Sequence, residues 1–114
     1  MTEITDVEKN KASKWFLSLR NDIVFAFEKI EKSHFEGPFS DSAPGKFEVK
    51  ETKRDDESGS DAGGGLMSVM RDGRVFEKVG VNVSTVYGNL NKVAQKSMAD
   101  RLGIPEMRED PKFW

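Results

Sequence analysis

The sequence predicts an α+β fold in which one long N-terminal amphipathic helix packs on an antiparallel β-sheet. Two observations support this class. Apolar residues recur at every third or fourth position along the first segment, and strand-like alternation of apolar and polar residues begins at Leu66. With 114 residues the chain is long enough for one domain with a small core.

The first segment predicts a helix from about residue 5 to residue 32. Thr5 and Glu8 form a capping-box pattern at its start, and Gly37-Pro38 follows its end. The apolar residues of the helix share one stripe, which we expect to cover the sheet. The stripe contains Ala12, Trp15, Phe16, Leu19, Ile23, Ala26, Phe27 and Ile30.

Residues 37 to 65 have the least regular pattern and are expected to be rich in loops. Phe47 to Glu51 alternates well enough for one short strand. The stretch from Asp55 to Gly65 is polar and small, which predicts a mobile loop or local disorder. Its glycine run lacks the Lys-Ser/Thr that follows in a nucleotide-binding P-loop. Glycine amides before a strand can nevertheless approach a carboxylate closely.

A β-hairpin is predicted over about residues 66 to 87, with a tight turn at Arg71-Asp72-Gly73. Alternation divides its second strand into an apolar side, expected to face the helix, and a side of polar or small residues. The apolar side is Val75, Val79, Val81, Val83 and Tyr87, and the other side is Phe76, Lys78, Gly80, Asn82, Ser84 and Val86. This second side is either a solvent-exposed sheet face or a platform against which a flat ligand can lie.

The C-terminal part predicts a second helix over about residues 89 to 102, because Gly103 and Pro105 supply its stop signals. Residues 103 to 114 are expected to form a truncated end. They finish on Phe113-Trp114, two large aromatic residues whose exposure favours association.

Composition excludes several classes of function. Eighteen basic residues against twenty acidic ones give a net charge of -2 with no basic run, which argues against nucleic-acid binding. The absence of cysteine excludes disulfides and removes the usual zinc sites. No apolar run approaches the ~20 residues of a membrane span and no signal peptide is visible, so we expect a cytoplasmic protein. His34, the single histidine, is expected at the surface, with neither a metal site nor a Ser-His-acid triad.

The segment GGGLMSVMRDGRVFEKVGVNVSTVYG, residues 63 to 88, resembles the signature region of oxygen-dependent coproporphyrinogen III oxidases. The resemblance extends to the leading helix, to the helix after Gly88 and to the closing EDPKFW. Two positions depart from the family pattern. No tryptophan precedes the glycines, where only Arg54 matches the usual tryptophan-and-arginine segment, and Tyr87 stands where a histidine is often found.

The resemblance implies the N-terminal part of an enzyme of haem biosynthesis. The family decarboxylates two propionates of coproporphyrinogen III to give protoporphyrinogen IX. It uses O2 as co-substrate and no organic cofactor, and the metal requirement stays open. Its members are homodimers built on a large flat antiparallel sheet flanked by helices, so residues 1–114 would form a single partial domain of that sheet.

Members of the family are longer, and the resemblance places their catalytic residues beyond Trp114. We therefore expect no catalytic residue, no metal ligand and no turnover by this chain alone. The alternative is a non-catalytic fragment, or a dimerisation or interaction module.

The candidate residues for a substrate cleft or dimer contact are Gly63, Gly64, Gly65, Ser68, Arg74, Glu77, Lys78, Asn82 and Ser84. Among them, Lys78, Arg74 and the glycine amides would meet carboxylates, and Glu77 would pair across the dimer.

Overall fold

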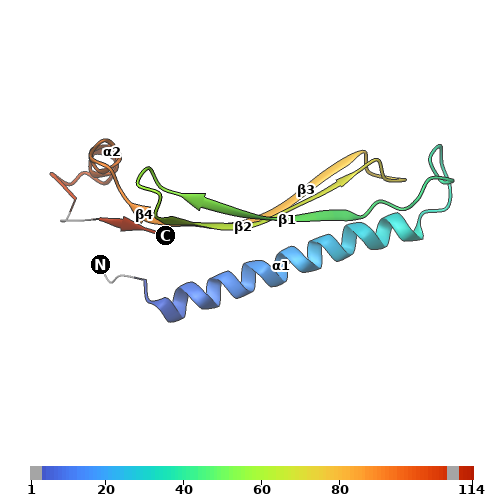
Figure 1. Cartoon of the computed structure of the whole chain (residues 1–114), viewed down its shortest axis with the longest axis horizontal. Helices are drawn as coiled ribbons and strands as arrows, with labels where there is room; N and C mark the ends of the chain where they lie inside the picture. Colours follow the sequence, from blue (N-terminus) through green and yellow to red (C-terminus); the bar gives the residue numbers. More distant parts are fainter. Residues whose placement is uncertain (1–3, 108–110) are drawn as a thin grey trace. The chain divides into compact units, whose positions relative to one another are not determined.

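A computed structural model describes residues 4–107 and 111–114. Its elements in chain order are α1 (Asp6–Ser33), β1 (Phe47–Asp55), β2 (Asp61–Arg71), β3 (Lys78–Val86), β4 (Gly88–Asn89), α2 (Lys92–Leu102) and β5 (Lys112–Phe113) (Figure 1). Strands β1, β2 and β3 form an antiparallel sheet in that order, and β4 pairs with β5. The long helix and the antiparallel sheet confirm the predicted α+β class.

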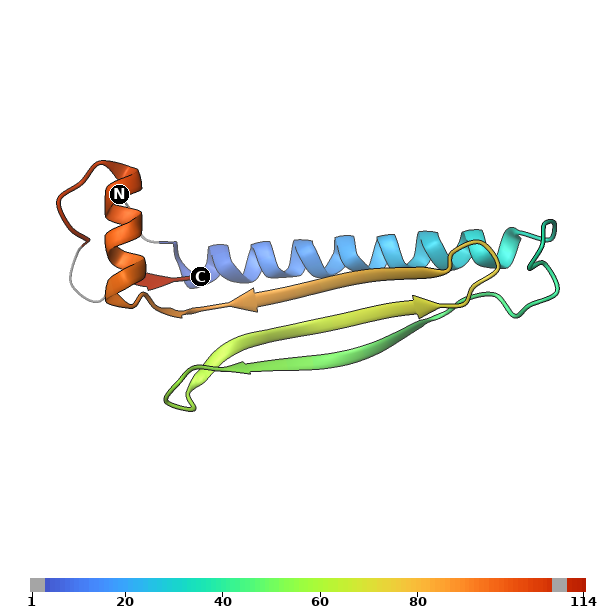
Figure 2. The same ribbon diagram turned by 90° about the horizontal axis from the view of Figure 1, so that it is seen from above.

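The chain divides into two compact units. The first contains Met1–Thr52 and Gly65–Ser84, and the second contains Lys53–Gly64 and Thr85–Trp114. In the first unit, α1 runs along one face of the strands (Figures 1 and 2).

The capping box at the start of α1 forms as the sequence predicts. The backbone N–H of Glu8 donates to the Thr5 hydroxyl at 3.2 Å, and the backbone N–H of Thr5 donates to the Glu8 carboxylate at 3.3 Å. These bonds satisfy two N–H groups that would otherwise lack partners at the helix end. The helix ends at Ser33, one residue from the predicted boundary, with His34 as its C-terminal cap.

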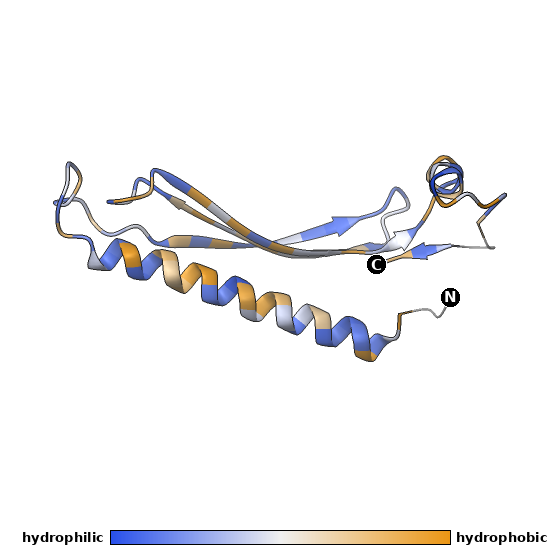
Figure 3. Cartoon of the chain, turned by 180° about the vertical axis from the view of Figure 1, so that it is seen from behind, coloured by the Kyte–Doolittle hydropathy of each residue, from blue (hydrophilic) through white to orange (hydrophobic). Residues whose placement is uncertain are grey.

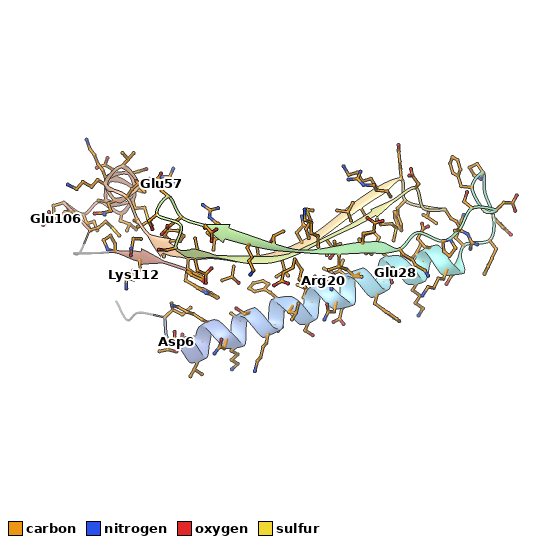
Figure 4. All side chains as sticks on the ribbon, viewed as in Figure 1. Asp6, Arg20, Glu28, Glu57, Glu106 and Lys112 are labelled. Carbon is orange, nitrogen blue, oxygen red and sulfur yellow. The ribbon has the colours of Figure 1, made fainter. Side chains whose placement is uncertain are left out.

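The side of α1 that meets the sheet differs from the predicted apolar stripe. Phe27 is the stripe residue whose ring contacts other rings: its centroid lies 6.3 Å from that of Phe47 in β1 and 4.8 Å from that of Phe76 in the turn after β2. Polar residues also contact the strands, among them Arg20 and Glu28, which Figure 4 shows on α1. The remaining large stripe residues are exposed: Trp15, Phe16, Leu19, Ile23 and Ile30. The prediction was wrong here because hydrogen bonds to the strands satisfy the polar groups and allow this side to face inward.

Glu31 is the polar residue that attaches the hairpin turn to α1. Its side chain is fully buried, and its carboxylate accepts hydrogen bonds from the backbone N–H groups of Gly45 at 2.8 Å, Val75 at 2.7 Å and Phe76 at 3.1 Å, and also from that of Arg74. Burial raises the pKa of this carboxyl, but the four backbone bonds outweigh it, so the pKa lies below its ordinary value. The carboxylate thus serves as the hydrogen-bond acceptor that water would otherwise provide for four backbone N–H groups.

The strands are longer than the sequence predicted. β1 continues to Asp55 and β2 begins at Asp61, so the expectation of a loop from residue 55 to 65 is wrong. The connecting turn is short because the Asp56 carboxylate accepts hydrogen bonds from the backbone N–H groups of Ser58 at 2.8 Å and Ser60 at 2.9 Å. This local Asp bonding is typical of turns.

The hairpin between β2 and β3 is present, but its turn differs from the predicted tight Asp-Gly turn. It spans residues 72 to 77, and Asp72 has a positive φ of 53°, whereas Gly73 does not have a positive φ. Val75 and Phe76 therefore lie in the turn rather than in the strand. The strand alternation does not apply to them, and the ring of Phe76 contacts Phe27 instead of sharing a side with Lys78.

In the second unit, α2 begins three residues later than predicted. Asn91 caps it by accepting a hydrogen bond from the Ala94 N–H at 2.8 Å, while Gly88–Asn89 pair with Lys112–Phe113. Gly103 ends the helix at φ 69°, as predicted. Lys112–Phe113, which belong to the expected truncated end, form a short strand, and residues 108–110 of that end lie outside the described residues.

Within residues 4–107 and 111–114, no helix has the length and apolarity to cross a membrane. The same part of the chain contains no group of three or more His, Asp or Glu side chains arranged to hold a metal ion.

Candidate functional site

The candidate site is one side of β3, which we call the open sheet face and define as Lys78, Gly80, Asn82 and Ser84. All four residues are exposed, whereas Val79, Val81 and Val83 between them are partly buried. Alternating strand residues point to opposite sides, so the valines face α1 and the open sheet face points away from it. Figure 3 shows the corresponding alternation of apolar and polar residues along the strands.

Strand β2 places its residues in the same manner. Ser68 is fully buried, and its hydroxyl accepts a hydrogen bond from the Arg20 guanidinium of α1. By alternation its neighbour Met67 points away from α1, and Met67 is 38% exposed. An apolar side chain on β2 therefore lies on the same side of the sheet as the open sheet face.

Gly80 leaves the open sheet face without a side chain near its middle. A Cβ built at this position would have no heavy atom within 4 Å. The absence of a side chain is consequently not required by packing against any described neighbour. It leaves bare backbone, over which a flat molecule can approach closely.

Asn82 is held in place through the strand next to it. Its side-chain carbonyl accepts a hydrogen bond from the Ser68 backbone N–H at 3.2 Å. The amide nitrogen occupies the other branch of the side chain and points away from this bond, with two hydrogens to donate. On the far side of Ser68, the Arg20 Nε is buried without a hydrogen-bond partner in the part of the chain that the structure describes.

The glycines of the predicted site have a packing role. A Cβ at Gly63 would lie 1.9 Å from the Thr85 carbonyl oxygen, and a Cβ at Gly65 would lie 1.9 Å from that of Val83. Larger residues are therefore excluded by the close approach of β3. The Gly63 N–H donates to the Asp61 carboxylate at 3.1 Å, so this amide already has an anionic partner. Gly64 lies between them in β2.

Arg74 and Glu77 lie in the hairpin turn rather than on the open sheet face. The Arg74 guanidinium donates from Nε to the Ser42 carbonyl at 2.6 Å and from Nη1 to the His34 carbonyl at 3.4 Å, and it lies 5.7 Å from the centre of the Phe35 ring. Glu77 is exposed, and its backbone carbonyl accepts a hydrogen bond from the Asp72 N–H at 2.8 Å. Of the predicted residues, Lys78, Asn82 and Ser84 thus share one side of β3.

The sequence interpretation missed a pair in the second unit, Tyr87 and Asp61. The Tyr87 hydroxyl donates to the Asp61 carboxylate. This bond, the Gly63 N–H and the charge of Lys53 lower the pKa of Asp61, while the same bond raises the pKa of Tyr87. No sequence signal links two residues so far apart.

These features define a class of protein first: an α+β chain whose sheet carries one uncovered side with a cation, an amide, a hydroxyl and a bare glycine. Comparison with known proteins then gives the family. The chain belongs to the coproporphyrinogen III oxidase family, which matches residues 11–113.

Relatives named oxygen-dependent coproporphyrinogen-III oxidase match nearly the whole chain. Two strains of Rickettsia bellii, RML369-C and OSU 85-389, each have one that is 42% identical over 109 residues, and Rickettsia felis has one that is 40% identical over 106 residues. The matches cover 93–94% of this chain but 33–34% of the relatives, so the chain spans about a third of their length. No solved structure matches.

Proposed function

We propose that this chain forms the N-terminal part of an oxygen-dependent coproporphyrinogen III oxidase and that the open sheet face supports the substrate macrocycle. The observation that carries the proposal is the open space over Gly80. Lys78, Asn82 and Ser84 lie on the same side of β3 as this space. Family membership supplies the reaction, the oxidative decarboxylation of two propionate groups to vinyl groups.

The chemistry of this face suits a broad macrocycle with several carboxylate arms. A strand rises about 3.3 Å per residue, so the side from Lys78 to Ser84 extends about 20 Å. The bare backbone at Gly80 allows the macrocycle to approach the strand closely, while the Lys78 ammonium pairs with a carboxylate arm. Asn82 and Ser84 each have hydrogen atoms to donate to carboxylate oxygens.

The reactive groups of the proposed enzyme lie outside this chain. Its one histidine, His34, is exposed at the end of α1. The proposal therefore gives the residues of the open sheet face a binding role. Protonation and oxidation would be carried out by residues in the remainder of the oxidase. The proposal also includes O2 as co-substrate, no organic cofactor, and a cytoplasmic homodimer in which the exposed Glu77 pairs with the partner.

A chimera tests the proposal. The chain is joined to the part of the Rickettsia bellii relative that it does not match, and conversion of coproporphyrinogen III is followed by product fluorescence in air. We expect turnover by the chimera and none by this chain alone. Gly80→Leu fills the open space and should lower kcat/KM by about tenfold or more, equivalent to about 1.4 kcal/mol.

Val93→Ala is the matched control, because Val93 is 81% exposed on α2 and lies outside the open sheet face. It should leave kcat/KM unchanged. Equal activity of the Gly80→Leu and Val93→Ala chimeras would remove the macrocycle from this face. Turnover by the unextended chain would show that the reactive groups lie within it.

A further inference from the structure

Three polar residues form a line of hydrogen bonds that crosses the sheet of the first unit. Arg20 of α1, labelled in Figure 4, donates from its guanidinium to the hydroxyl of Ser68 in β2. The backbone N–H of Ser68 donates in turn to the side-chain carbonyl of Asn82 in β3 at 3.2 Å. Ser68 is fully buried, whereas Asn82 is exposed on the open sheet face. A cation on the helix side of the sheet is thus linked to an amide on the opposite side.

The backbone donor at Ser68 determines how the Asn82 carboxamide is oriented. A backbone N–H donates and cannot accept, so the carboxamide must turn its oxygen toward β2. The NH2 group occupies the other branch of the side chain, and its hydrogens are available to an acceptor above the open sheet face. The outward group is therefore a hydrogen-bond donor. It suits carboxylate oxygens and disfavours ammonium and other donor groups.

The environment of Arg20 is unfavourable in one respect. Its guanidinium donates to two uncharged acceptors, the Asn21 side-chain carbonyl at 2.8 Å and the Ser68 hydroxyl. Its Nε is buried and has no hydrogen-bond partner among the described residues. A buried donor without a partner destabilises a fold, and such local conflicts are typical of functional positions. In return, the guanidinium anchors Ser68 and with it the amide that orients Asn82.

We propose that Arg20 and Ser68 are positioning residues that hold the Asn82 amide outward, so that the open sheet face selects a macrocycle by its carboxylate arms. This inference rests on the proposed function and adds the residues that orient one of its contacts. It also explains why an amide suits position 82. In Asn82→Asp, one carboxylate oxygen would accept the same bond from Ser68, and the second, negatively charged, would point outward. It would repel a carboxylate arm.

The exchange Asn82→Asp tests the outward donor while keeping the bond to Ser68. Binding of coproporphyrin III by the whole chain is measured by fluorescence titration at low ionic strength. The affinity should fall by at least about tenfold, because a like-charge contact replaces a hydrogen bond. Asn89→Asp is the matched control, since it adds the same charge at an exposed position of β4 outside the open sheet face. It should change the affinity by less than about twofold. Equal losses in both variants would overturn the proposal.

The positioning role is tested in the unliganded chain by the heteronuclear NOE of the Asn82 side-chain nitrogen. Arg20→Met removes the donor to the Ser68 hydroxyl, so it should lower this NOE and weaken coproporphyrin III binding by at least about threefold. Arg20→Lys can still donate to Ser68 and should restore both. Lys29→Met removes a charge from the opposite side of α1, where Lys29 is exposed, and should change neither. An unchanged NOE in Arg20→Met would overturn the positioning role.

These readouts distinguish this inference from the proposed function. Gly80→Leu can weaken the binding of coproporphyrin III while Asn82→Asp behaves like Asn89→Asp. The macrocycle would then lie on the open sheet face without being selected by the amide, and only the inference would fail. If Gly80→Leu and Asn82→Asp both leave the affinity unchanged, the proposed function fails as well.

Discussion

Replacement of Glu31 by alanine tests the physical basis of the first unit most severely. The substitution removes one buried carboxylate that serves four backbone N–H groups, those of Gly45 and of the hairpin turn. The Gly45 amide lies in a buried hydrogen bond, and leaving it without an acceptor costs about 1–3 kcal/mol. The three partly buried turn amides regain water and lose about 0.5 kcal/mol each. The sum is about 3 kcal/mol, a large share of the stability of a small domain.

Urea unfolding followed by far-UV circular dichroism measures this loss. Glu28→Ala is the graded control, because the Glu28 carboxylate accepts one partly buried bond, from the Phe47 N–H at 3.0 Å, and should cost about 1 kcal/mol. Asp22→Asn, on the exposed side of α1, should stay within about 0.5 kcal/mol of the parent. A loss below about 1 kcal/mol for Glu31→Ala would refute the reasoning that the carboxylate attaches the turn to the helix.

Three further predictions follow from the same contacts. The pKa of Glu31 is lowered in the folded chain, so the ionised carboxylate stabilises the fold at pH values above the ordinary pKa of 4.5, and this stabilisation is lost as the pH falls through the lowered pKa. Urea midpoints measured from pH 6 downward should therefore decline in that range. This decline should be absent in Glu31→Gln. Gly65→Ala should prevent normal pairing of β2 with β3, since its Cβ would meet the Val83 carbonyl oxygen at 1.9 Å, whereas Gly80→Ala should leave the urea midpoint unchanged or slightly higher; equal effects would contradict the geometry. Asn91→Ala should destabilise α2 by about 1 kcal/mol, seen as faster amide exchange in its first turn, and unchanged exchange would mean that the cap contributes nothing.

Features encoded within a few residues of each other were predictable from the sequence. The capping box at Thr5 and Glu8, the left-handed Gly103 and the alternation along β3 each depend on local spacing, and the structure contains all three. The open sheet face follows from the same alternation. The sequence did not decide whether this face contacts solvent or a ligand, because both produce the same alternating pattern.

Features that depend on contacts between distant segments were not predictable. Hydrophobicity suggested that Trp15 and Leu19 cover the sheet, but both are exposed. The buried residue of α1 is Glu31, whose carboxylate accepts hydrogen bonds from amides more than forty residues later. The glycine run appeared loop-like because glycine is unfavourable in strands. In fact the close approach of β3 requires glycine at positions 63 and 65 of β2.

The most direct measurement of the central claim is an NMR titration of the isotopically labelled chain with coproporphyrin III, the planar tetracarboxylate related to the proposed substrate. Ring currents shift amides that lie under the macrocycle. We predict saturable shifts at Lys78, Gly80, Asn82 and Ser84 that weaken strongly in Gly80→Leu. Shifts confined to α1 or to the second unit, or saturable shifts that persist unchanged in Gly80→Leu, would contradict a substrate platform on this side of β3.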